Sequence, residues 1–402
     1  MTQHRYVRFI FASFFLSLLL GGGNRILAAD YYVSWQSGND TNSGISPEAP
    51  WKSLARVNHA DLQPGDRVLL HVGETWREEL RPPVSGAQDQ PIVFTSYGNG
   101  PRPILDGNGD GSGDHNGPIS RTSSKKTPTR DVAIDNNERS HIVYDGLELR
   151  HVLEGLRVYA WSASVRDITM QNCLVQTEVA PVPPRQASAG VYANVRTGTI
   201  SELHVLGNHF IPYPRGLNHW GVYLVGGVQH FRIDENTFGP SGEDAITIWH
   251  SAYGEIALNQ GGGNGENTID VKDSHDIVIR NNDADLDREY NIVVHSVDAP
   301  DSTYNVHVEG NRCLRGGQGG ELSAGIALLF VQKSGVEDNV VNSAYGSGIL
   351  IKDAGAHSEN WASRNRLTAN GVGQKLQAIV LQGASTARID DNQIVPPPIP
   401  AR

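Results

Sequence analysis

A repeat of 23 residues constrains the fold of this chain more than any other feature of its sequence. Three similar segments follow one another, with the sequences GEDAITIWH at 242–250, GENTIDVKD at 265–273 and REYNIVVHS at 288–296. The interval holds at an acidic, an apolar and an amide position at once, namely Glu243, Glu266 and Glu289, Ile246, Ile269 and Ile292, and Asn236, Asn259 and Asn282. A fixed period of this length indicates coils stacked on one another, so that equivalent residues form columns.

From residue 131 to residue 395, two kinds of short strand-like segment alternate. The first kind has aliphatic residues at alternating positions and recurs at 155–160, 190–195, 221–226, 245–250, 268–273, 291–296, 325–330, 348–353 and 378–383. The second kind leads into an asparagine, at Asn208, Asn236, Asn259, Asn282, Asn311, Asn339, Asn365 and Asn392, with Asn172 one step out of register. We expect this column to be structural, since asparagine tolerates left-handed turns and stacked amides hydrogen-bond to one another.

These coils predict an all-β fold, a right-handed parallel β-helix. Their lengths run from 23 to about 35 residues, which is shorter than the four-stranded repeat of a propeller. The Leu-x-x-Leu-x-Leu signature of leucine-rich repeats is absent. We therefore expect one elongated unit over 131–395 rather than several globular domains.

The first 29 residues have the pattern of a secretory signal peptide. A basic start with Arg5 and Arg8 precedes an apolar run over 9–20, and the small residues Ala28 and Ala29 follow. The apolar run is too short to span a bilayer comfortably, which argues against the alternative of a membrane anchor. We expect cleavage after residue 29 and a secreted or periplasmic protein.

Residues 30–130 differ from the repeat and are predicted to form an N-terminal cap that merges into the first coils. Strand patterns occur at 31–33, 67–72, 91–97 and 103–106, and residues 51–57 have apolar residues at helical spacing. An open stack of coils exposes strand edges at its ends, and such edges need covering. Residues 107–130 are predicted to form a surface loop, and residues 396–402 form a proline-rich tail.

The composition narrows the function classes. The chain has 402 residues, a formal net charge of −11 and 38% hydrophobic residues. Because it has no basic stripe, we expect no binding to nucleic acid, whereas an acidic polysaccharide is compatible if a cation or local basic residues mediate the contact. Cys173 and Cys313 lie about five coils or roughly 24 Å apart, so both are expected to be buried and unpaired. We expect a monomer.

The alternation within the first kind of strand divides its side chains between two faces. Aliphatic residues such as Ile246 and Ile248 point into the coil, so the positions between and after them point outward. One outward column contains Tyr223, Thr247, Asp270 and Val293, and another contains Val225, Trp249, Lys272, His295, Leu329 and Lys352. A third column contains His219, Glu243, Glu266, Glu289 and Ser323. We expect the acids of these columns to share an outward patch with Lys272, His295 and Trp249.

The stacked acids of this patch need a counter-charge. Three carboxylates roughly 4.8 Å apart would repel one another strongly. A hard cation such as Ca²⁺ takes several oxygen ligands and would offset the repulsion. We predict as its ligands Glu243, Asp244, Glu266 and Asp270. The alternative is that some of these acids are solvated while others pair with nearby lysine and arginine side chains.

The coil pattern, the asparagine column and the N-terminal cap together resemble the pectate-lyase superfamily of right-handed parallel β-helices over nearly the whole mature chain. Asp270-Val271-Lys272 is similar to the Asp-x-Lys pattern of family 9 pectate lyases, in which the lysine is the base and nearby acids hold Ca²⁺. The resemblance implies that Lys272, with a lowered pKa, removes the proton alpha to a sugar carboxylate. The alternative for Lys272 is a salt-bridged lysine on an acidic surface. Val293 replaces an acid of that family's pattern.

Other outward residues are predicted to support catalysis and binding. His295, one coil beyond Lys272, is a candidate second acid/base, although a lone surface histidine is more often inert. The candidate substrate contacts are Trp249, Tyr223, Glu289 and Lys352. The aromatic residues would stack on sugar rings, or else cover neighbouring loops. Lys352 would bind a distant acidic sugar, or nothing.

Three functions are compatible with these features. The first is a secreted polysaccharide lyase, or C5-epimerase, that acts on uronic-acid polymers with Ca²⁺ assistance. The second is a glycoside hydrolase, because residues 243–246 are similar to the Asp-Asp-x-Ile segment of family 28 polygalacturonases and two carboxyls suit acid/base hydrolysis. That family's neighbouring motifs are replaced at 218–220 and 266–268, so the hydrolase ranks second. The third is a non-catalytic carbohydrate-binding or surface protein with a structural Ca²⁺ site.

Overall fold

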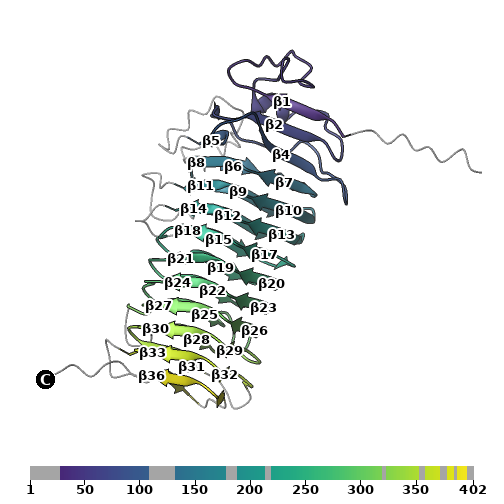
Figure 1. Ribbon diagram of the computed structural model, residues 1–402. Coiled ribbons are helices and arrows are strands. Elements are labelled where there is room, and N and C mark those ends of the chain that lie inside the picture. Colours follow the sequence, from purple (N-terminus) through teal and green to yellow (C-terminus); the bar gives the residue numbers. More distant parts are fainter. Residues whose placement is uncertain are drawn as a thin grey trace, which may run out of the picture.

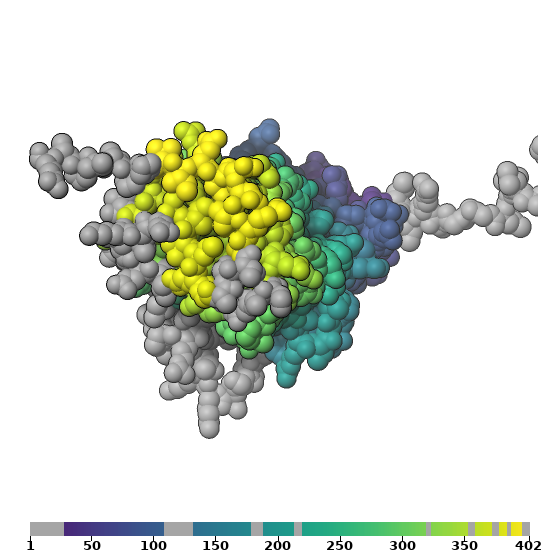
Figure 2. All heavy atoms as spheres, turned by 90° about the horizontal axis from the view of Figure 1, so that it is seen from below, coloured from purple at the N-terminus to yellow at the C-terminus, as the bar shows by residue number. Residues whose placement is uncertain are grey.

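The computed structural model describes residues 28–107, 132–177, 188–212, 219–318, 323–352, 358–371, 378–383 and 387–395. The predicted signal peptide apart from its last two residues, nearly all of the predicted loop 107–130 and the tail 396–402 lie outside this part. Three parallel sheets wind into one elongated column that runs from β1 (Asp30–Val33) to β36 (Gln393–Val395) (Figure 1). Figure 2 looks along this column from its C-terminal end. The predicted right-handed parallel β-helix is confirmed.

Each coil contributes strands to the three sheets. The first sheet contains β1, β2 (Arg67–His71), β4 (Ile92–Tyr97), β7 (Ile142–Asp145), β10 (Val165–Gln171), β13 (Ile200–Leu206), β16 (Val228–Gln229), β17 (Arg232–Asp234), β20 (Ala252–Ala257), β23 (His275–Arg280), β26 (Tyr304–Glu309), β29 (Gly335–Glu337), β32 (Trp361–Ser363) and β35 (Arg388–Asp390). The second contains β3 (Thr75–Trp76), β5 (Ile104–Asp106), β8 (Glu148–Val152), β11 (Leu174–Thr177), β14 (His209–Ile211), β18 (Thr237–Phe238), β21 (Gln260–Gly262), β24 (Asp283–Asp285), β27 (Arg312–Leu314), β30 (Val340–Asn342), β33 (Arg366–Thr368) and β36. The third contains β6 (Val132–Asp135), β9 (Glu154–Ala160), β12 (Ser188–Val195), β15 (His219–Val225), β19 (Ile246–Trp249), β22 (Asn267–Lys272), β25 (Tyr290–His295), β28 (Ala324–Leu329), β31 (Ser347–Lys352) and β34 (Ile379–Gln382).

The three sheets enclose an apolar core because each coil places the same kind of residue at the same position. On the third sheet, Ile246, Ile269 and Ile292 pair in register and are fully buried. Burial of one such side chain contributes about 1.5–3 kcal/mol. All nine strands of the first predicted kind lie in this sheet, so the alternation in the sequence identified its inner face and all of its strands except β6.

The asparagine column forms a hydrogen-bonded ladder between the first and second sheets. The Asn259 Nδ2 donates to Asn282 Oδ1 at 3.0 Å and to the carbonyl of Ile233 at 2.9 Å. The backbone N–H of Asn259 donates to the same Oδ1 at 3.0 Å. Equivalent bonds link the column coil by coil from Asn208 to Asn392, and the predicted structural role is confirmed.

The left-handed residue of each turn is the one before the ladder asparagine, which corrects the expectation that the asparagine adopts this geometry. Leu258 has φ of 55° and Asn281 has φ of 54°, and this backbone turn directs the next side chain into the column. Asn172 is itself left-handed, with φ of 53°. Cys173 follows it and takes the ladder position, where its N–H donates to Asn208 Oδ1 at 2.9 Å. Because Cys173 occupies the ladder position in this coil, Asn172 is one position out of register with the asparagine column.

The N-terminal region already belongs to the column. The strands expected at 31–33, 67–72, 91–97 and 103–106 are present as β1, β2, β4 and β5, and β1 pairs in parallel with β2. The helix α1 (Leu54–Val57) is shorter than the predicted 51–57. Trp51 instead forms a β-bridge with Val33, and the Ser53 side chain caps the helix by accepting the N–H of Arg56 at 3.0 Å.

Cys173 and Cys313 are free and buried, as predicted. Cys173 directly precedes β11 and Cys313 lies in β27, and these two strands are five pairing steps apart in the second sheet. In the part of the chain that the structure describes, no helix has the length and apolar character needed to cross a membrane.

Candidate active site

The outer face of the third sheet carries the predicted patch. The register of β19, β22 and β25 aligns Thr247, Asp270 and Val293 in one column, and Trp249, Lys272 and His295 in another. The glutamates stack in a third column, since the N–H of Glu266 donates to the Glu243 carbonyl at 3.1 Å and the N–H of Glu289 donates to the Glu266 carbonyl at 2.9 Å. The predicted juxtaposition of these residues is therefore confirmed.

Asp270 contacts one lysine and one histidine side chain. Its own side chain is 3% exposed, and Lys272 Nζ lies 2.7 Å from its Oδ2. The Nε2 of His295 lies 2.8 Å from its Oδ1. Burial acts to raise the pKa of Asp270, but the charges and hydrogen bonds of His295 and Lys272 outweigh burial and lower it below the ordinary value. Asp270 is an ionised carboxylate at neutral pH.

The same contacts determine the state of Lys272. Burial acts to lower the pKa of Lys272, but the charge and hydrogen bond of Asp270, aided by the charge of Asp244, outweigh burial and raise it. Its Nζ also lies 5.5 Å from the ring centre of Trp249, a cation–π contact. The expected lowered pKa is therefore not found, because the buried carboxylate stabilises the ammonium ion. The structure favours the salt-bridged alternative for this lysine.

Asp244 lies just before β19 and is buried on the same face as Asp270. Its Oδ1 accepts hydrogen bonds from the backbone N–H and the Nδ2 of Asn267, at 3.0 and 2.8 Å. Its Oδ2 accepts one from Thr247 Oγ1 at 2.6 Å. Burial, and next the negative charge of Asp270, raise the pKa of Asp244 to about 7. The pKa values of two neighbouring carboxyls are thus displaced in opposite directions.

The glutamate column reduces its own repulsion with a proton. Burial raises the pKa of Glu266 to about 8, and the charges of Asp244 and Glu243 act in the same direction. The side chains of Glu266 and Glu243 share a hydrogen bond, which requires one of them to be protonated. Glu289 lies at the exposed end of the column. A proton therefore supplies part of the compensation that was expected from Ca²⁺.

The four predicted calcium ligands do not form a compact oxygen cage. Both oxygens of Asp270 and both oxygens of Asp244 already accept protein donors. Among the described ranges, the group of acidic and histidine side chains with ligand atoms mutually within 4.8 Å is His250, Asp273 and Asp298, none of them a predicted ligand. Calcium binding by the glutamate column stays a prediction.

Asp273 organises the loop beside the patch. Its Oδ1 accepts the N–H groups of Val297 and Asp298 at 2.8 and 3.1 Å, and its Oδ2 accepts Trp249 Nε1 at 2.9 Å. Asp298 Oδ2 in turn lies 2.8 Å from His250 Nε2. Because its oxygens already serve as acceptors for the loop and for Trp249, we assign Asp273 a positioning role.

The predicted aromatic contacts have most of their ring surface occupied. Tyr223 lies between the rings of Tyr192 and Trp220, at centre distances of 5.4 and 4.7 Å. Trp249 stacks on His250 at 5.3 Å. A sugar would therefore meet ring edges at both positions. Burial raises the pKa of Tyr223 to about 12, so its hydroxyl is a neutral hydrogen-bond donor.

Lys352 lies away from the patch. It is three pairing steps from Lys272 along the same column, through His295 and Leu329. Its Nζ lies 4.9 Å from the ring centre of Phe330. The structure therefore separates Lys352 from the residues around Asp270.

Three residues of this site were not predicted as functional: Thr247, Asn267 and Asp273. Thr247 was placed in the column of Asp270, and Asn267 is 23 residues after Asp244, so the repeat carried a signal for both. Asp273 was not singled out, because two of its partners, the N–H groups of Val297 and Asp298, lie in a loop outside the repeat pattern.

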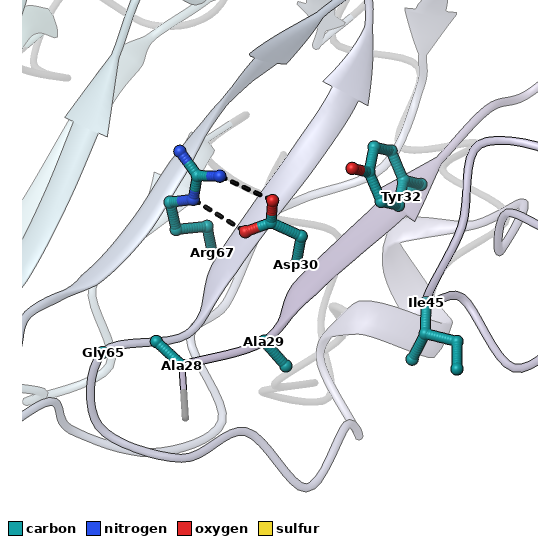
Figure 3. A pocket seen from close by; sticks show the side chains of 7 residues that line it. All are labelled: Ala28, Ala29, Asp30, Tyr32, Ile45, Gly65 and Arg67. Atoms are coloured by element: carbon teal, nitrogen blue, oxygen red, sulfur yellow. Dashed lines mark hydrogen bonds and ion pairs between the residues drawn. The ribbon is translucent and has the colours of Figure 1, made fainter. Parts of the chain in front are cut away.

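A surface hollow at the N-terminal end is separate from this site (Figure 3). Its lining consists of Ala28, Ala29, Asp30, Tyr32, Ile45, Gly65 and Arg67. Arg67 and Asp30 form an ion pair across it. Its strands, β1 and β2, belong to the first sheet, whereas the carboxyl patch lies on the third. We therefore assign it no part in the chemistry.

Comparisons with known proteins place these features in context. Residues 201–396, slightly less than half of the chain, match a family model described as periplasmic copper-binding protein (NosD). The chain is 41% identical over 85 residues to a lacto-N-biosidase of Bifidobacterium longum subsp. longum, a stretch that spans 20% of this chain and 5% of that protein.

Solved structures match over most of the column. A GH136 lacto-N-biosidase of Eubacterium ramulus has a TM-score of 0.65 and 19% identity, over 92% of this chain and 68% of that one. An alginate lyase of Paenibacillus has a TM-score of 0.52 and 16% identity, over 84% and 97%. This chain thus has the right-handed parallel β-helix fold that its resemblance to the pectate-lyase superfamily predicted.

Proposed function

We propose that this chain is a secreted or periplasmic glycoside hydrolase in which Asp244 is the general acid and Asp270 the nucleophile. The carrying observation is the pair of neighbouring carboxyls with opposite pKa displacements. Cleavage of a glycoside needs one protonated and one ionised carboxyl, held in that state by their surroundings. The local similarity to a lacto-N-biosidase supports this reaction class, and the signal-like N-terminus and the periplasmic description of the matching family support the location.

In the proposed reaction, a carboxylate oxygen of Asp270 bonds to the anomeric carbon as the bond to the leaving oxygen breaks. Asp244 gives its proton to that leaving oxygen. Asp244 then takes a proton from water, whose oxygen replaces Asp270 on the anomeric carbon. Lys272 and His295 hold Asp270 ionised and oriented, while Thr247 and Asn267 orient Asp244.

The register of the sheet indicates the stereochemical outcome. Asp244 contacts Thr247, and Thr247 is the direct cross-strand neighbour of Asp270. We expect the two carboxyls to be separated by about one strand spacing, roughly 4.8 Å. This is close to the about 5–5.5 Å of retaining glycosidases and below the about 6.5–9.5 Å of inverting ones. We therefore expect retention of the anomeric configuration.

The charge of the patch favours a neutral substrate. Its acids Glu243, Glu266 and Glu289 stack in one column, and Asp270 already neutralises Lys272. A polyuronate would meet net repulsion here unless a cation intervened. A neutral or N-acetylated oligosaccharide avoids this cost. The test is hydrolysis of a panel that contains a chromogenic lacto-N-bioside and neutral oligosaccharides, with proton NMR to follow the anomer released first.

The pH profile is the first quantitative prediction. Because Asp244 must carry a proton and its pKa is about 7, kcat/KM is expected to fall tenfold per pH unit above about pH 7. Because the pKa of Asp270 is lowered, the acid limb is expected below the ordinary aspartate range. Rates measured from pH 3 to pH 10 check both limbs. A rate that climbs steadily from pH 7 to pH 10 would contradict the assignment of Asp244.

The lyase or C5-epimerase is retained as a second candidate because Lys272 lies on the outer face beside Asp270. It requires Lys272 to lose its proton and requires compensation of the acidic column, for which Ca²⁺ bound by Glu243 and Glu266 is the proposed source. Elimination would give an unsaturated product that absorbs in the ultraviolet. Its rate would rise in alkaline solution because the Lys272 pKa is raised.

Replacement of Lys272 by arginine separates the two candidates. Arginine keeps the positive charge beside Asp270 and does not deprotonate, so a hydrolase is expected to keep about a tenth or more of its kcat/KM. A lyase that uses Lys272 as its base would lose turnover. Both outcomes are read from initial rates on a substrate that the wild-type protein turns over. The matched control is Lys333→Arg, because Lys333 lies on the side of the first sheet and not on the third sheet with Lys272.

Copper binding is not part of this proposal, although the name of the matching family refers to it. Copper sites use imidazole and soft sulfur ligands. Cys173 and Cys313 are buried on the second sheet side of the core and lie far apart. In the His250 group, Asp273 already accepts loop hydrogen bonds, so the donors described here do not fit a copper site.

A further inference from the structure

Five aromatic side chains form a continuous cluster on the N-terminal side of the carboxyl patch. This five-ring cluster consists of Trp161, Tyr159, Tyr192, Tyr223 and Trp220. Ring centres are separated by 5.6 Å for Trp161 and Tyr159, 5.6 Å for Tyr159 and Tyr192, 5.4 Å for Tyr192 and Tyr223, and 4.7 Å for Tyr223 and Trp220. Aromatic pairs at these distances stabilise one another. The cluster is therefore a firm surface.

The cluster is continuous with the proposed catalytic residues. Tyr192, Tyr223, Thr247 and Asp270 occupy one outward column on four successive strands of the third sheet, from β12 to β22 (Figure 1). Trp161 directly follows β9, which is four pairing steps from the strand of Asp270, or roughly 19 Å at about 4.8 Å per step. A ligand that touches both Asp270 and Trp161 must therefore be an extended chain of several sugar residues.

Two arginine side chains contact the rings of the cluster. Arg157 Nε lies 2.6 Å from Glu154 Oε2, and its guanidinium covers the ring of Tyr159 at 5.2 Å. Arg196 lies over the ring of Trp161 at 5.0 Å. The neutral polar groups are hydroxyl and amide, such as Tyr192 Oη, which accepts Asn194 Nδ2 at 2.9 Å. Burial and adjacent acids raise the pKa of Tyr223 to about 12, so its phenol also stays neutral.

We propose that the five-ring cluster is an extended binding site for a neutral oligosaccharide, which runs along the helix axis from Asp270 toward Trp161. Sugar rings combine apolar C–H faces with hydroxyl edges, and a surface of aromatic rings with a few neutral donors and acceptors complements both. Because Tyr223 packs between two rings, it contacts the ligand by its edge. Trp161, which is 50% exposed, supplies the open surface at the far end. This inference rests on the proposed function for the position of cleavage.

The test measures binding without turnover. In an Asp270→Asn background, isothermal titration is performed with chitohexaose, cellohexaose, the corresponding disaccharides and hexagalacturonate. We expect at least one neutral hexaose to bind and hexagalacturonate to bind more weakly. Trp161→Ala is expected to raise the Kd for that hexaose by about tenfold, in keeping with the loss of one aromatic contact. The affinity for the disaccharide is expected to fall much less, because a disaccharide cannot span the four pairing steps from β9 to β22.

Trp35→Ala is the matched control. Trp35 is also an exposed tryptophan, at 42%, with a cation over its ring, Lys52 at 5.1 Å, and it lies in the N-terminal region. It is expected to leave the Kd unchanged. An equal effect of both variants, the absence of binding by either neutral hexaose, or tighter binding of hexagalacturonate overturns the inference. A change in oligomeric state on size exclusion with unchanged saccharide affinity would assign the cluster to self-association and overturn it as well.

These outcomes are distinguishable from those for the proposed reaction. If a neutral hexaose binds in a way that depends on Trp161 but the wild-type protein hydrolyses no substrate, the hydrolase proposal is contradicted and the binding-site proposal stands. If the protein hydrolyses its substrate equally well without Trp161, and KM does not change with the length of the oligosaccharide, the binding-site proposal is contradicted and the hydrolase proposal stands. A second variant, Tyr192→Phe, retains the ring while it removes the hydroxyl acceptor of Asn194. It is expected to keep hexaose affinity within about threefold of the parent, as the loss of one neutral hydrogen bond implies.

Discussion

Replacement of Asp270 by asparagine is expected to lower kcat/KM by roughly 10³-fold or more, the effect of losing a nucleophile or a general acid/base. The amide cannot attack the anomeric carbon, and it cannot pair with both Lys272 and His295 as the carboxylate does. Initial rates on a neutral saccharide substrate provide the measurement. Thermal unfolding of the same variant is needed beside them, because Lys272 is left partly buried without its counter-ion.

A second variant distinguishes loss of the nucleophile from loss of the fold. Asp270→Ala leaves space beside the anomeric carbon, so azide or formate is expected to restore part of the turnover and to invert the configuration of the first product. Asp276→Asn, a more exposed aspartate on β23 that pairs with His275, is the matched control and is expected to change the rate less than about twofold. Full activity of folded Asp270→Asn would rule out its catalytic assignment.

Replacement of Asn282 by alanine is expected to cost about 3–5 kcal/mol of unfolding free energy. The Asn282 side chain accepts from the N–H and Nδ2 of Asn259 at 3.0 Å each, and donates to the Ile256 carbonyl and Asn311 Oδ1 at 2.9 Å each. Its removal leaves buried donors and an acceptor without partners, at about 1–3 kcal/mol per orphaned group. Asn282 is 2% exposed and lies between neighbouring coils on both sides.

Urea denaturation followed by circular dichroism measures this loss as a lower midpoint, and the unfolding rate measures it if refolding is incomplete. Asn342→Ala is the matched control. Asn342 is partly exposed on β30 and accepts one local hydrogen bond from Ser343, so its replacement is expected to cost less than about 0.5 kcal/mol. Equal stabilities of the two variants would show that the ladder does not hold the coils together.

The sequence predicted best those features that follow directly from a backbone conformation repeated in every coil. Ile246, Ile269 and Ile292 recur at one interval, and the only way to bury such a column is to stack the coils in register. The same interval predicted the asparagine ladder. It did not predict which residue of the turn is left-handed, since Leu258 adopts that geometry although a leucine side chain has no preference for it.

The candidate site was predictable in its position and less so in its chemistry. The alternation of the strands placed Asp270, Lys272 and His295 on one face, where the structure finds them in contact. It did not reveal that Asp270 is buried although it faces outward. That burial, with the short contact to Lys272, raises the pKa of the lysine. The role of Lys272 as the base of a lyase had required a lowered pKa instead.

The period and alternation of the sequence by themselves determined the fold, the sheet that carries the patch and the column of each side chain, because these depend on backbone geometry that repeats every coil. Only the tertiary structure decided how deeply Asp244 and Asp270 are buried, which donors reach them and which of them keeps a proton. The physical reason is that a pKa depends on desolvation and on charges within a few ångströms. Loops and neighbouring coils supply both, and no periodic pattern encodes their approach.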